Sequence, residues 1–72
     1  MTEPFHEYDV VAVTSDVPEA GLARGQVGTI VHVHSPQAFE VEFVDDEGRT
    51  YALCTLAASQ LLLLHYTPIK AA

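Results

Sequence analysis

The stretch Ala38-Phe39-Glu40-Val41-Glu42-Phe43-Val44 decides the fold class, because apolar and acidic side chains alternate along it. Successive side chains of an extended strand point to opposite faces of a sheet. The apolar side chains of this stretch therefore share one face, and Glu40 and Glu42 share the other. The alternation predicts an antiparallel strand that is buried on one face and solvated on the other.

The strand that precedes this stretch sets the first register. Residues 27–34 are rich in valine and lead into the stretch through the turn at residues 35–37. Ile30 interrupts the alternation of apolar and polar positions, so we expect a bulge near Gly28. The three-residue turn predicts these cross-strand pairs: Val33 with Phe39, Val31 with Val41, and His32 with Glu40.

The turn that follows the stretch sets the second register. In the turn at residues 45–49, Gly48 takes the left-handed position of a type I turn with a bulge. Residues 50–56 then form the next strand. This turn predicts two cross-strand pairs, Phe43 with Tyr51 and Val41 with Leu53, and it places Ala52 and Cys54 on the outer face.

Two further strands and two connections complete the chain. Residues 9–14 and 61–65 have the apolar, partly β-branched composition of short strands. The loop at residues 15–24 contains Leu22, which we expect to fold over the open end of the core. Residues 57–60 are too few for a stable α-helix and predict a 3₁₀ turn. The predicted core contains Val11, Val31, Val41, Phe43 and Leu53.

These elements describe an all-β domain, a small five-stranded antiparallel SH3-like barrel with a 3₁₀ turn before the last strand. The 72 residues make one domain, with the barrel over residues 5–65 and a tail over residues 66–72.

Several runs of sequence resemble the bacterial family called domain of unknown function 4926. They are Tyr8-Asp9-Val10-Val11, the run from Leu22 to His32, Glu40-Val41-Glu42-Phe43-Val44, and the run from Leu56 to Leu61. The resemblance extends from Phe5 to Leu64, and it implies an SH3-like fold and no known activity. A shorter run, Arg24-Gly25-Gln26-Val27-Gly28, is similar to the barrel of the nitrile hydratase β subunit. Because the metal site of that enzyme lies on the partner chain, the similarity implies no catalytic residue here.

The composition argues against several classes of function. Three Lys and Arg residues against ten Asp and Glu residues give a net charge of −7, which opposes binding to nucleic acids and to anionic membranes. One cysteine excludes an internal disulfide framework. The first residues lack the basic and then apolar order of a signal peptide, so we expect a cytoplasmic protein.

The side chains that could carry chemistry form no recognised catalytic motif, so no catalytic or cofactor-binding residue is predicted. His32 and His34 share a strand face with Glu40 or Glu42 opposite, and we expect a solvated His–Glu pair rather than a metal site. Cys54 has no neighbouring cation in the sequence to lower its pKa, so we expect a structural thiol. The acids at residues 45–47 lack the ligand spacing of a calcium loop.

The leucine run near the C-terminus is the most informative surface feature. Two of its four leucines are expected to enter the barrel and two to face water, because alternate strand residues point to opposite faces. The C-terminal tail or an N-terminal segment that carries Phe5 and Tyr8 could cover the outward leucines within the chain, and a partner protein offers another way. The candidate interface consists of Leu61, Leu62, Leu63, Leu64, Tyr66 and Ile69.

Two hypotheses about function follow. The first is a non-enzymatic protein–protein interaction module, an antitoxin or immunity type of protein or an accessory subunit. Its partner is either a second copy in a homodimer or another protein. The second is a hydratase-like or metal-dependent enzyme component that uses His32 and His34.

Overall fold

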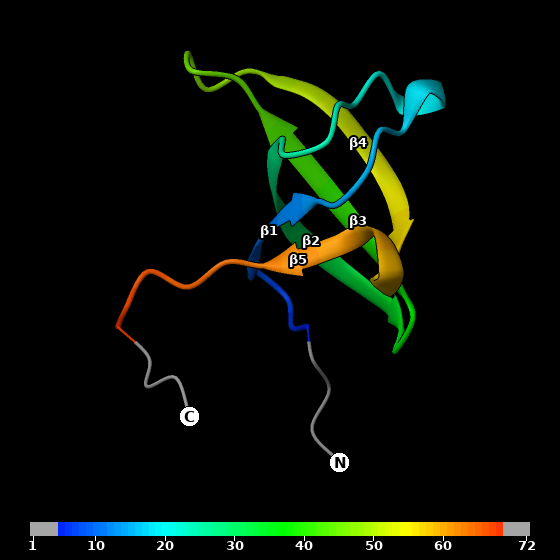
Figure 1. Cartoon of the computed structure of the whole chain (residues 1–72), viewed down its shortest axis with the longest axis vertical. Coiled ribbons are helices and arrows are strands. Elements are labelled where there is room, and N and C mark those ends of the chain that lie inside the picture. Colours follow the sequence, from blue (N-terminus) through cyan, green and yellow to red (C-terminus); the bar gives the residue numbers. More distant parts are fainter. Residues whose placement is uncertain (1–4, 69–72) are drawn as a thin grey trace.

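The computed structural model describes residues 5–68, and its framework is a single sheet of five antiparallel strands (Figure 1). The strands lie in the order β4-β3-β2-β1-β5. Their bounds are β1 Val10–Val13, β2 Val27–Ser35, β3 Ala38–Val44, β4 Thr50–Ala57 and β5 Leu61–Leu63. Two 3₁₀ turns, η1 Pro18–Ala20 and η2 Ala58–Gln60, lie in the first loop and before β5. The all-β class and the 3₁₀ turn before the last strand are thus confirmed.

The register between β2 and β3 agrees with the sequence prediction only near the turn. Val33 pairs with Phe39 and His32 pairs with Glu40, as expected. The predicted pair of Val31 with Val41 is wrong, because an irregularity between Ile30 and His32 makes Ile30 the partner of Val41. Ile30 is therefore fully buried, whereas Val31 is only half-buried. The bulge lies further along the strand than the expected position near Gly28.

The register between β3 and β4 differs from the prediction by one residue. Phe43 pairs with Ala52 and Val41 with Cys54, while Tyr51 has no partner at the irregularity beside Val44. One extra residue on β4 exchanges the two faces of the strand. Leu53 therefore lies outside the core with 57% of its surface exposed, and Ala52 and Cys54 pack against the core instead of facing outward.

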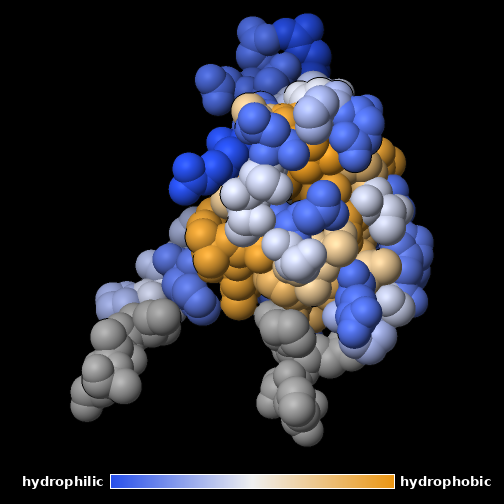
Figure 2. All heavy atoms as spheres, turned by 45° about the vertical axis from the view of Figure 1, so that its right-hand side comes forward, coloured by the Kyte–Doolittle hydropathy of each residue, from blue (hydrophilic) through white to orange (hydrophobic). Residues whose placement is uncertain are grey.

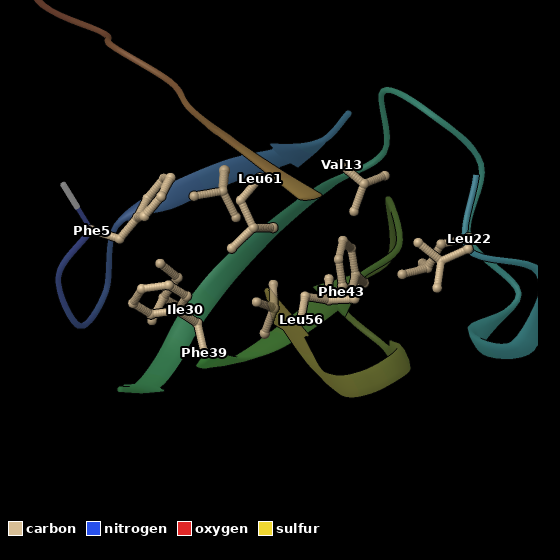
Figure 3. Close-up of a cluster of buried hydrophobic side chains, with 11 residues drawn as sticks. Phe5, Val13, Leu22, Ile30, Phe39, Phe43, Leu56 and Leu61 are labelled. Carbon is tan, nitrogen blue, oxygen red and sulfur yellow. The ribbon is translucent and has the colours of Figure 1, made fainter. Parts of the chain in front are cut away.

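The core lies on the inner face of the curved sheet and is closed at each end by a residue from outside the sheet. Val11, Val41 and Phe43 are fully buried, as predicted. Leu22, from the first loop, is 3% exposed and lies at one end, which confirms its expected role (Figure 3). Phe5 lies at the opposite end with its ring centroid 5.2 Å from that of Phe39. The buried cluster is Phe5, Val11, Val13, Val17, Leu22, Ile30, Phe39, Val41, Phe43, Leu56 and Leu61.

The last strand is shorter than predicted, ending at Leu63 instead of His65. It pairs with β1, so that Leu61 lies beside Val13 and Leu63 beside Val11. Both leucines pack on the core, and Leu62 points to the opposite face. Among residues 5–68 there is no helix with the length and hydrophobicity that crossing a membrane would require.

Candidate interaction surface

The outer face of β5, β1 and β2 carries an apolar patch, the Leu62 patch, made of Val10, Ala12, Val27 and Leu62. Ala12 is the cross-strand partner of Leu62 on one side and of Val27 on the other. Leu62 is 56% exposed and Val27 is 47% exposed. Ala12 is buried but lies outside the core cluster, because its side chain points away from the core between these two larger neighbours. The register of three strands therefore builds one continuous apolar surface.

The structure divides the leucines of the candidate interface between core and surface. Leu61 is buried, Leu63 and Leu64 are half-buried, and Leu62 is the exposed member. Tyr66 is 78% exposed, and Ile69 lies outside the described residues. The sequence pattern does not reveal Ala12 and Val27 as part of this surface, because only the register places Ala12 between Leu62 and Val27.

Residues 5–8 leave Leu62 exposed. Phe5 enters the core against Phe39. Tyr8 has a positive φ of 73° and is 71% exposed, while its backbone N–H donates to the carbonyl oxygen of Ile30. Leu62 keeps 56% of its surface exposed with both aromatic residues in place. The segment that offered an internal cover therefore leaves this leucine in contact with solvent.

His32, His34 and Glu40 form a contact group on the outer face of β2 and β3. His34 Nε2 lies 2.9 Å from Glu40 Oε1, and the His32 and His34 rings meet edge to face with centroids 4.7 Å apart. Thr55 donates its hydroxyl to Glu40 over 3.4 Å. Glu40 thus contacts His34, although its partner in the strand register is His32. Within the described part of the chain, no three His, Cys, Asp or Glu side chains converge as metal ligands would.

Cys54 is a half-buried free thiol beside the core. Burial raises the pKa of Cys54, and the negative charges of Glu40 and Glu19 raise that pKa further. A raised pKa lowers the fraction of thiolate at neutral pH, and the thiolate is the nucleophilic form. The surroundings of Cys54 therefore favour the structural interpretation of this residue.

The acids at the β3–β4 turn organise the turn itself. Asp45 Oδ1 accepts hydrogen bonds from the backbone N–H groups of Glu47 and Arg49, over 2.8 and 2.9 Å. The Arg49 guanidinium contacts the carboxylates of Asp45 and Glu47. Gly48 has a φ of 83°, in the left-handed region that the sequence predicts for this position. The turn leaves Asp46 without a role in these contacts.

The glycine pair of the run Gly25-Gln26-Val27-Gly28 has two separate structural roles. Gly25 has a φ of 93°, and its N–H donates to the carbonyl oxygen of Val13 over 2.8 Å. A Cβ at Gly28 would lie 2.8 Å from the Phe43 ring and from Val41 Cγ1. The motif therefore serves a turn and a close packing contact.

Comparison with known proteins gives one match. A family model described as Domain of unknown function (DUF4926) matches residues 7–63. No curated protein and no solved structure matches the chain significantly. The matched range contains all five strands and the whole of the Leu62 patch.

Proposed function

The chain belongs to the DUF4926 family, and we propose that it is a non-enzymatic protein–protein interaction module. The single observation that carries this proposal is the Leu62 patch. Burying an exposed leucine side chain stabilises an assembly by roughly 1.5–3 kcal/mol. A patch of this kind on the outer face of a small sheet is typical of an interaction surface.

The occupant that fits the Leu62 patch is a second copy of the chain. Leu62, Ala12 and Val27 carry no charge, so two copies can meet there without placing like charges in contact. A two-fold axis buries such a patch against its own copy, which is the commonest arrangement of soluble oligomers. The homodimer would leave the acidic β3 face of each copy available to another protein.

We further propose that the module is a small SH3-like barrel. The sheet order, the long first loop closed by Leu22 and the 3₁₀ turn before β5 support an SH3-like barrel. The net charge of −7 is compatible with an antitoxin or immunity type of protein that covers a basic partner, or with an accessory subunit. The alternative, an enzyme component that uses His32 and His34, needs further metal ligands that the described residues do not bring to this pair.

Sedimentation at micromolar concentration tests the proposal. The wild-type chain should sediment as a dimer, and Leu62→Glu should sediment as a folded monomer. Leu53→Glu is a matched control, because Leu53 is 57% exposed on β4, away from the patch, and Leu62 is 56% exposed. A wild-type monomer at these concentrations would contradict the homodimer. Dissociation by Leu53→Glu instead of Leu62→Glu would place the interface elsewhere.

A further inference from the structure

The outer edge of β4 is a second unoccupied surface of the sheet. β4 is eight residues long and, within residues 5–68, pairs only with β3, so one edge of the strand faces away from the sheet. Among the described residues, no backbone group outside β3 bonds to the backbone of residues 50–56. An edge of this kind presents a row of unpaired N–H and C=O groups to solvent.

The sequence of β4 lacks the features that normally protect an edge strand. Residues 50–57 read Thr-Tyr-Ala-Leu-Cys-Thr-Leu-Ala and contain no charged residue and no proline. The irregularity at Tyr51 disturbs only the start of the strand. Tyr51 and Leu53 are 44% and 57% exposed, and Figure 2 shows apolar surface on the side of the molecule along which β4 runs. Natural proteins usually blunt such edges with lysine, proline or a covering segment.

We propose that the edge of β4 binds an extended, basic segment of a partner protein, which adds to the sheet as a sixth strand. This proposal concerns a different surface from the Leu62 patch and does not depend on the homodimer. The backbone of the added strand would pair with the free groups of β4, and its side chains would alternate between the two faces of the sheet.

The charge of the partner follows from the acids beside β4. Glu40 is the cross-strand partner of Thr55, and Glu42 is the partner of Leu53. A lysine or arginine on the added strand would reach Glu40 across the short Thr55 side chain, because its long side chain and that of Glu40 can together span two strand spacings, about 9.6 Å. The acids at residues 45–47 lie at the turn that begins β4 and add further negative charge.

The same acids disfavour a second copy of the chain at this edge. Pairing of two β4 strands would place the Glu40 and Glu42 carboxylates of both copies in one sheet, and the net charge of −7 on each copy opposes this pairing at low ionic strength. A segment with basic residues on one face and apolar residues on the other matches both sides of β4. Its basic residues would lie on the same face of the sheet as Glu40 and Glu42, and its apolar residues on the core side. Ala52 and Cys54, which pack against the core, lie on that apolar side.

Titration with a designed peptide tests this inference. The probe is an end-blocked peptide of about ten residues that alternates valine and lysine, long enough to span a typical strand. Its control alternates valine and glutamate, which keeps the extended pattern and reverses the charge. Calorimetry measures binding, and hydrogen exchange locates it. Binding of the lysine peptide with new protection at alternate amides of β4 supports the proposal.

Two variants make the test specific. Glu40→Gln should weaken binding of the lysine peptide by about threefold, the effect of losing one exposed ion pair. Glu7→Gln, which removes an acid from the segment before β1, should leave the affinity within experimental error. The monomeric Leu62→Glu variant should bind the peptide as the wild type does, so failure of the homodimer would not affect this result. Absence of binding, equal binding of the glutamate peptide, or protection confined to other strands would overturn the proposal.

Discussion

At the scale of single residues, Gly28 shows how closely β2 approaches the core. A Cβ at this position would lie 2.8 Å from the Phe43 ring and from Val41 Cγ1. Because Phe43 and Val41 are fully buried and have little room to move, Gly28→Ala should lower the free energy of unfolding by about 1–3 kcal/mol. Urea denaturation measures the change. The cost should shrink in a Phe43→Leu background, and an equal cost in both backgrounds would show that the ring is not the obstacle.

A second prediction at the residue scale concerns Cys54. Burial raises its pKa first, with added contributions from Glu40 and Glu19, so the folded state favours the neutral thiol. The contribution of the neutral Cys54 thiol to the free energy of unfolding is fully present below the ordinary thiol pKa. It is lost as pH rises through the raised pKa. The free energy of unfolding of the wild type should therefore fall, relative to that of Cys54→Ala, as pH rises above the ordinary thiol pKa of 9.0. Parallel pH profiles of the two proteins would contradict the shift.

At the scale of elements, the β3–β4 turn depends on Asp45 more than on its acidic neighbours. Asp45 Oδ1 accepts two backbone hydrogen bonds, and the Asp45 backbone exchanges bonds with Gly48 and Arg49. Asp45→Ala should lower the free energy of unfolding by about 1–2 kcal/mol, since exposed turn hydrogen bonds contribute modestly. Asp46→Ala removes the same charge but none of these bonds, so it should change stability by less than about 0.5 kcal/mol. Equal effects in thermal denaturation would assign the contribution to charge alone.

At the scale of the whole molecule, the homodimer and the β4 edge should respond to salt in opposite directions. Each chain carries a net charge of −7, so two chains repel each other at low ionic strength. Raising the salt from about 0.01 M to about 0.15 M shortens the Debye length from about 30 Å to about 8 Å. The dissociation constant of the homodimer should therefore fall, and that of the lysine peptide should rise. Sedimentation and calorimetry measure the two trends, and weaker dimerisation at higher salt would contradict an apolar interface.

The sequence alone determined the fold class, most of the strands and the Leu22 contact. Alternation in residues 38–44 requires one buried face, and the valines and the glycine-containing turns limit where strands begin and end. Leu22 is an apolar residue in a polar loop, and burial in the core is the favourable outcome for it. The same composition predicts the candidate interface in the leucine run, because a narrow core has room for only one face of each strand.

Only the tertiary structure decided the two registers and, through them, the surface. The length of a turn predicts the register of its two strands only if neither strand contains a bulge. A bulge adds one unpaired residue and leaves no mark in the local composition, so the turns did not reveal the irregularities at Val31 and Tyr51. These irregularities placed Ile30 in the core and moved Leu53 to the surface. The Leu62 patch likewise depends on Ala12 lying between Leu62 and Val27, residues that are far apart in the chain. Packing of the whole core determines which residues become such neighbours. A shift of one residue in the pairing of two strands would reverse both faces of a strand and move its apolar side chains out of the core.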